Sequence, residues 1–106
     1  MITDLIIVKA KFALYSTDKG GRKTPIISGY RPNHVFEYKE NSNDFVTTYI
    51  GDVNFEGQEF LSPDETIITT VRFLRHGNIE KFLQKGRIWW IHEGKNKIGE
   101  AKIIEI

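Results

Sequence analysis

The sequence has no cysteine among its 106 residues. This absence excludes a disulfide framework and a thiolate metal site, and it fits a reducing compartment, so we expect a cytoplasmic protein. Long hydrophobic runs are absent too: nothing approaches the roughly 20 apolar residues of a membrane span. The N-terminus lacks a basic segment ahead of its short apolar run, which argues against a signal peptide. We expect no contact with a membrane.

A strong charge of one sign is also lacking, since the net charge is +1. The distribution is uneven, however. Residues 1–35 hold six basic and two acidic side chains (+4), residues 36–66 one and eight (−7), and residues 67–106 eight and four (+4). A fold that joins the two ends would gain a basic face and an acidic face. Ordinary solvated strand edges would give the same distribution, and both interpretations stay open.

Catalytic and metal-ligand patterns are missing. His34, His76 and His92 are too scattered to form a ligand motif. Residues 20–24 (Gly-Gly-Arg-Lys-Thr) resemble a phosphate loop only superficially, because the flanking strand, the helix and the glycine spacing are absent. We therefore expect no enzyme, no metal, no cofactor and no nucleotide bound by this chain.

What the chain does contain is alternation of apolar and polar residues, which is typical of half-buried strands. The pattern runs through residues 5–15, 66–74, 86–92 and 97–106. The residues expected inside are Ile6, Val8, Ala10, Phe12, Val71, Phe73, Trp89 and Ile91. Strands about ten residues apart, separated by turn signals, predict a single all-β domain over residues 1–106, either a sandwich or a barrel.

The middle of the chain is less regular. Residues 33–39 alternate loosely, and residues 45–50 form a β-branched and aromatic run that we expect to end in a turn at Gly51-Asp52. Residues 53–61, with Gly57 among them, are a weaker strand candidate.

One helical signal lies between Gly77 and Gly86. Ile79, Phe82 and Leu83 have i, i+3, i+4 spacing, and Asn78 is a plausible N-cap. The pattern predicts at most two helical turns.

The segment of residues 19–32 concentrates turn-forming residues around an apolar pair, Ile26-Ile27. Two adjacent glycines at 20 and 21 allow a tight reversal, and two prolines stiffen the rest. We expect a structured loop that presents Arg22, Lys23 and Arg31 on a fixed backbone.

This loop also carries a resemblance. Residues 20–25 (Gly-Gly-Arg-Lys-Thr-Pro) and 29–32 (Gly-Tyr-Arg-Pro) resemble the start of the third, C-terminal domain of elongation factor Tu. Residues 91–94 (Ile-His-Glu-Gly) and 98–99 (Ile-Gly) resemble that family's Ile-Arg-Glu-Gly and Val-Gly, and residues 62–65 stand where it has a Pro-Gly-Asp turn. The resemblance covers nearly the whole chain from about Leu5.

The resemblance implies a closed six-stranded antiparallel β-barrel, which in that family contacts the T-stem backbone of transfer RNA, packs on a GTPase domain and receives an exchange factor. The RNA-contacting positions that carry over are Arg22, Lys23, Asn33, Glu93 and Gly94. The last two would meet ribose hydroxyls. Tyr30 would be barrel structure.

Several positions depart from the family. His92 replaces its arginine, Asn33 a glutamine and Trp90 a small residue. Residues 77–86 are longer than its turn, and residues 38–58 align poorly. We expect no GTPase domain and no second barrel.

Two functions remain open. The first is binding of structured, tRNA-stem-like RNA through residues 20–24. The second is a protein-interaction module that docks on a GTPase, an exchange factor or another translation component. For that alternative Trp90 and Arg31 are the expected contacts, because we expect Trp90 to be a large exposed indole. Such an indole would also suit a homodimer.

Overall fold

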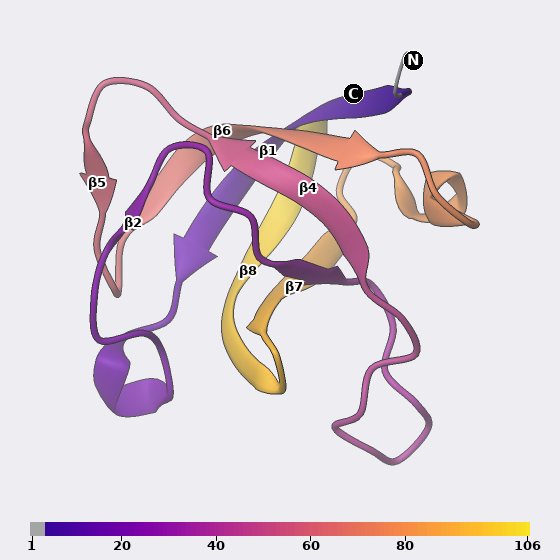
Figure 1. Cartoon of the computed structure of the whole chain (residues 1–106), viewed down its shortest axis with the longest axis horizontal. Coiled ribbons are helices and arrows are strands. Elements are labelled where there is room, and N and C mark those ends of the chain that lie inside the picture. Colours follow the sequence, from indigo (N-terminus) through magenta and orange to yellow (C-terminus); the bar gives the residue numbers. More distant parts are fainter. Residues whose placement is uncertain (1–3) are drawn as a thin grey trace.

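Six strands close on one another in the computed structural model, which describes residues 4–106 (Figure 1). All neighbours are antiparallel. The order around the barrel is β1 (Leu5–Leu14), β6 (Thr66–Leu74), β4 (Tyr49–Asn54), β3 (Asn33–Val35), β7 (Ile88–Glu93) and β8 (Asn96–Glu105), which pairs again with β1. A separate two-stranded sheet joins β2 (Ile26–Ile27) to β5 (Phe60–Leu61) at the side of the barrel. The predicted fold class, an all-β closed six-stranded antiparallel barrel, is confirmed.

The barrel interior is filled by the alternating side chains of the long strands. Of the eight residues predicted to face inward, Val8, Ala10, Phe12, Val71, Phe73, Trp89 and Ile91 are buried, with no more than 1% of their surface exposed. Ile6, near the start of β1, is only partly buried and packs at the margin of the core. The period of two in these strands therefore identifies the core, because successive side chains on a strand point to opposite faces.

His34 is a polar member of this core. Its side chain is fully buried and meets the ring of Phe73 edge-on at 4.9 Å. Trp89 Nε1 donates to His34 Nδ1 over 3.0 Å, so His34 Nε2 carries the proton and donates to the carbonyl oxygen of Gly51, also over 3.0 Å. Both ring nitrogens are thus satisfied, which is what a buried imidazole requires.

The burial of His34 predicts loss of stability in acid. Desolvation lowers its pKa to about 4 from an ordinary 6.5, so the unfolded chain binds a proton more readily than the native one. The free energy of unfolding is therefore highest above pH 6.5, where His34 is neutral in both states. It decreases by about 3 kcal/mol in total as the pH falls toward 4, because protonation of His34 favours the unfolded chain. Urea unfolding at pH 7, 5.5 and 4.5 measures this decline. A His34 ring that titrates near its ordinary pKa by NMR would contradict the prediction.

The turn predicted at Gly51-Asp52 is wrong, because both residues lie inside β4. Tyr49, Gly51 and Val53 face the core, and a Cβ on Gly51 would lie 2.8 Å from the carbonyl oxygen of Arg72 on β6. This glycine thus permits close packing of strands. Phe45, the predicted start of this strand, instead makes an isolated bridge to Tyr38.

The weak candidate at residues 53–61 is interrupted. Asn54 ends β4, Gly57 has a φ of 87°, and the chain resumes as β5 at Phe60. The predicted single strand is therefore two short ones that belong to different sheets.

The predicted helical segment exists as a single 3₁₀ turn, η2 (Ile79–Phe82), and Ile79, Phe82 and Leu83 are all buried as their spacing predicts. Phe82 stacks on Phe36 with ring centroids 5.1 Å apart. Asn78 occupies the N-cap position, but its side chain makes no capping hydrogen bond. The turn adds an apolar cover to the core.

Between residues 4 and 106 no helix has the length and apolar character needed to cross a membrane. The start of the stretch weighed as a signal peptide, residues 1–3, lies outside the described part of the chain.

Candidate nucleic-acid interface

The loop at residues 20–25 begins with two glycines that are required for different reasons, one for its backbone conformation and the other for close packing. Gly20 ends the 3₁₀ helix η1 (Thr17–Lys19) with a φ of 91°, a left-handed conformation that favours glycine. Gly21 lies against the preceding chain: its N–H donates to Ser16 O over 2.9 Å, and a Cβ there would lie 2.1 Å from Tyr15 O. The glycine pair therefore fixes where the chain leaves the turn, and so where Arg22 starts.

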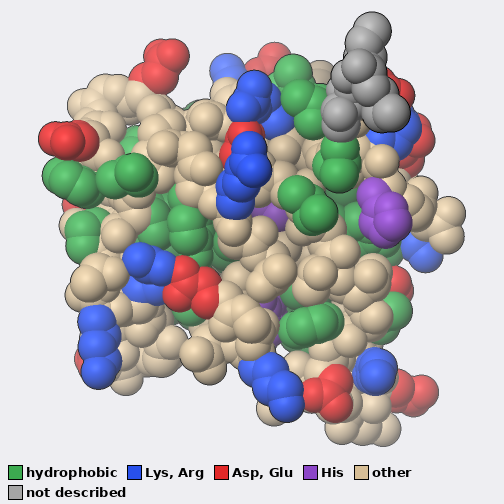
Figure 2. Space-filling model, in the orientation of Figure 1, with side chains coloured by type: hydrophobic (Ala, Val, Ile, Leu, Met, Phe, Trp, Pro, Cys, Tyr) green, Lys and Arg blue, Asp and Glu red, His purple; other side chains and the backbone are tan. Residues whose placement is uncertain are grey.

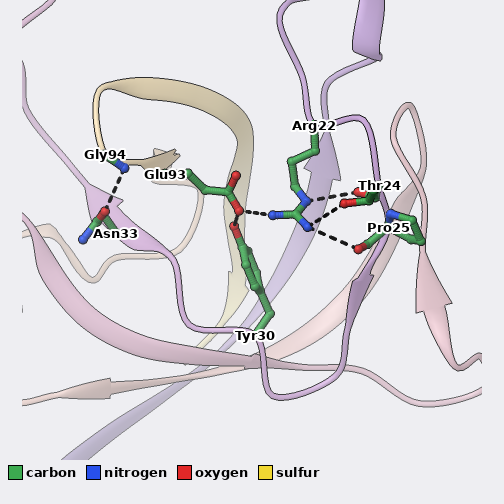
Figure 3. Close-up of polar contacts among 7 residues, drawn as sticks. All are labelled: Arg22, Thr24, Pro25, Tyr30, Asn33, Glu93 and Gly94. Carbon is green, nitrogen blue, oxygen red and sulfur yellow. Dashed lines mark hydrogen bonds and ion pairs between the residues drawn. The ribbon is translucent and has the colours of Figure 1, made fainter.

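The guanidinium of Arg22 is held by several hydrogen bonds to the loop that follows it (Figure 3). Its Nε donates to Thr24 O over 3.1 Å, and its Nη2 donates to Thr24 Oγ1 over 3.0 Å and to Pro25 O over 3.4 Å. Its Nη1 forms an ion pair with Glu93 Oε2 from the far end of the chain. Arg22 is thus rigid and its charge is shared with Glu93, so it acts mainly as the element that orients this carboxylate.

Tyr30 approaches the same carboxylate. Its hydroxyl donates to Glu93 Oε2, and the ring lies beneath the Arg22 guanidinium, 5.5 Å from ring centroid to Cζ. Burial, and after it the hydrogen bond to Glu93, raise the pKa of Tyr30, so the phenol stays protonated. The prediction that Tyr30 packs in the barrel holds for its ring, which is partly buried against the core. Its hydroxyl belongs to the site.

Asn33 and Gly94 meet on the other side of Glu93 (Figure 3). Gly94 lies in the turn between β7 and β8 with a φ of 60°, and its N–H donates to Asn33 Oδ1 over 3.2 Å. The side chain of Asn33 is exposed and its oxygen is committed to Gly94, so its NH₂ group remains for an outside acceptor. Arg22, Asn33, Glu93 and Gly94 therefore form one connected group.

The two remaining basic candidates lie apart from these contacts. Lys23 is exposed next to Arg22, and no ion pair within residues 4–106 includes it. Arg31 is also exposed, but it lines a shallow hollow on the outer wall together with Ile50 and Asp52. The loop therefore presents its basic side chains in two directions.

Trp90 faces outward, as strand alternation predicts, but the expectation of a large exposed indole is wrong. The side chain is partly buried. Tyr38 packs edge-on against it with ring centroids 5.2 Å apart, and Lys97 Nζ lies 5.7 Å from its ring centroid. The segment after β3 brings Tyr38 over Trp90, and that segment belongs to the part of the chain, residues 38–58, that aligns poorly with the family.

His92 connects Tyr38 to the turn at Gly94, a role that the sequence analysis does not predict. It is buried, its Nε2 lies 2.6 Å from the hydroxyl oxygen of Tyr38, and its Nδ1 lies 3.3 Å from Gly94 O. Burial lowers the pKa of His92 and favours the neutral ring. The imidazole thus ties the Tyr38 segment to the turn that carries Glu93. The sequence signal was the departure from arginine at this position.

The site and the fold together define a small all-β barrel domain with a polar cluster at the β7–β8 turn. The chain matches no protein-family model. In the part of the chain that the structure describes, no group of three or more histidine, aspartate or glutamate side chains is placed to hold a metal ion.

Proposed function

We propose that this chain is a non-catalytic binding domain related to the third domain of elongation factor Tu, and that it binds the stem of a structured, tRNA-like RNA in the cytoplasm. One observation carries the proposal. Arg22, Asn33, Glu93 and Gly94 come from three distant segments, yet hydrogen bonds join them in two adjacent pairs at one turn. These are four of the five positions at which the resemblance implies RNA contact.

The chemistry suits a duplex backbone. Lys23 provides an exposed ammonium for a phosphate, and the Asn33 NH₂ group can donate to a phosphate or to a ribose oxygen. Glu93, oriented by Arg22 and Tyr30, can accept from a 2′-hydroxyl. Because few cations take part, discrimination comes from hydroxyl contacts and shape more than from charge.

Replacing Arg22 and Lys23 together with alanine tests the proposal. We expect hairpin RNA affinity to fall about tenfold, because a phosphate contact and the orientation of Glu93 are lost together. The logarithmic dependence on salt should flatten by about one unit, since Lys23 makes the main phosphate contact. Fluorescence titration with an RNA hairpin and its DNA equivalent, at several salt concentrations, measures both quantities.

Leu5→Asp is the matched control, because Leu5 on β1 is separated from Asn33 on β3 by two strands, β6 and β4, so the change should leave RNA affinity unchanged. The RNA hairpin should bind more tightly than the DNA hairpin, which lacks 2′-hydroxyls. Equal binding of both hairpins by the native protein and the double variant would rule out the proposed site.

A second candidate function, docking on a GTPase, an exchange factor or another translation component, is favoured by a different surface. Leu5, Leu74 and Ile50 lie side by side across β1, β6 and β4, and Leu5 and Ile50 are 44% and 62% exposed. The Arg72–Asp52 ion pair and Arg31 border this row. Figure 2 shows hydrophobic side chains over β4 and β6 next to a column of basic and acidic ones.

Such an apolar row with a charged border fits a protein contact, either with a partner or in a homodimer. This alternative gives Arg31 its role and leaves the Arg22–Glu93 group as a structural tie. In that case Ile50→Asp abolishes complex formation, and the Arg22 and Lys23 substitutions leave it intact.

A further inference from the structure

The outer faces of β7, β8 and β1 carry lysines with aromatic side chains between them. We call this surface the lysine–aromatic wall, and it consists of Lys11, Tyr15, Tyr38, Trp90, Lys97 and Lys102. It lies outside the barrel, whereas Glu93 lies with Tyr30 and Arg22 at the β7–β8 turn. The proposed stem site uses none of these side chains.

The pairing of the strands places two of these lysines against each other. Lys102 on β8 is directly opposite Lys11 on β1, and its other neighbour is Ile88 on β7. Like charges directly opposite each other destabilise a sheet. No ion pair among residues 4–106 joins either lysine to a carboxylate. Folding gains nothing from this pair, whereas a bound anion would relieve the repulsion.

The aromatic side chains lie next to this pair. Lys97 Nζ is 4.8 Å from the ring centroid of Tyr38, which packs edge-on against Trp90. Trp90 is directly opposite Glu100, whose carboxylate accepts a hydrogen bond of 2.9 Å from the Tyr15 hydroxyl. A shallow hollow of about 330 Å³, lined in part by Lys11, Lys102 and Glu100, opens beside these groups.

We propose that the lysine–aromatic wall binds a single-stranded RNA segment. The phosphates contact Lys11, Lys97 and Lys102, and an unpaired base stacks on the part of the Trp90 ring that Tyr38 and Lys97 leave exposed. Aromatic platforms flanked by cations are the usual means of holding single strands, because every base has a face that stacks. The inference rests on the proposed function for its choice of RNA, and it adds an unpaired strand to the stem.

The link to the stem site is structural. His92 contacts Tyr38 on the wall through Nε2 and Gly94 O in the β7–β8 turn through Nδ1. The two surfaces therefore meet at one residue, so a strand that leaves a stem bound at Glu93 and Gly94 would run onto the wall.

Three RNAs test the proposal: a blunt hairpin, the same hairpin with an unpaired overhang, and the overhang sequence alone. With the native protein the overhang should raise affinity about tenfold. Trp90→Leu and Lys102→Glu should remove that gain and leave binding of the blunt hairpin unchanged. Lys39→Glu, an exposed lysine outside the wall, is the matched control and should keep the gain. Binding of the single strand should also change indole fluorescence, which reports Trp90 because Trp89 is fully buried.

Lys102→Glu has a second readout that a purely structural role would not give. It sets an opposite charge against Lys11, so the melting temperature should rise while overhang binding is lost.

The outcomes separate this proposal from the proposed function. No gain from the overhang, together with unchanged fluorescence, overturns the wall and leaves stem binding intact. If the overhang and the single strand bind while the blunt hairpin does not, single-strand binding at the lysine–aromatic wall is supported and stem binding at the β7–β8 turn is overturned. Equal displacement of the single strand by a polyglutamate peptide would identify an acidic protein partner and overturn the proposal.

Discussion

Val71→Asp is expected to abolish folding. Val71 lies in the middle of β6, fully buried, with Val8 of β1 opposite on one side and Val53 of β4 opposite on the other. A carboxylate there has no cationic partner, and burying it costs several kcal/mol even if it becomes protonated. A domain of this size has about 5–15 kcal/mol of stability in total. Circular dichroism should therefore show no cooperative thermal transition.

Thr70→Asp is the matched control, because it places the same charge one residue earlier. Thr70 is exposed, and its neighbour on β1 is Lys9, so this variant should fold with a stability close to the native value. A Val71→Asp protein that melts like the native one would mean that the register of β6 is wrong.

Gly21→Ala is expected to have the second largest effect. A Cβ at this position would lie 2.1 Å from the carbonyl oxygen of Tyr15 and 2.8 Å from that of Ser16. These contacts are with backbone and cannot be relieved by a side-chain rotation, so the turn itself must move. We expect the free energy of unfolding to fall by more than about 3 kcal/mol, as for other changes that force the backbone out of place. RNA affinity should fall as well, since Arg22 follows directly.

Gly20→Ala separates this steric effect from a general need for glycine. Gly20 has a φ of 91°, but no atom within 4 Å would meet its Cβ. The substitution strains only the backbone and should cost about 1 kcal/mol. Urea unfolding of both variants measures the difference. Equal losses of stability would contradict the tight approach of Gly21 to Tyr15.

The strands that could be predicted are those with long, uninterrupted alternation. β1 and β6 each hold nine or ten residues, and a period of two over that length leaves little freedom in which face is buried. β3 and β4 gave no such signal. β3 has three residues, and the inward position of Gly51 in β4 depends on its approach to the backbone of β6, which only the folded sheet creates.

The candidate site shows the same limit. Its residues followed from motifs at the two ends of the chain, but their pairings did not. Arg22 and Glu93 are 71 positions apart, and the sequence did not indicate that they neutralise each other. The burial of His92 and the cover of Tyr38 over Trp90 depend on how residues 36–48 fold back on β7, and nothing local in that segment predicts it.

NMR titration of the ¹⁵N-labelled protein with the RNA hairpin tests the central claim most directly, because it locates the ligand on the surface. We expect the amide signals of Lys23 and Gly94 and the side-chain amide of Asn33 to shift in a saturable manner that weakens with salt. The signals of Leu5 and Leu74, at the end of the apolar row that lies away from Asn33, should stay in place. Shifts confined to that apolar row, or no shift at low salt, would contradict RNA binding at the β7–β8 turn.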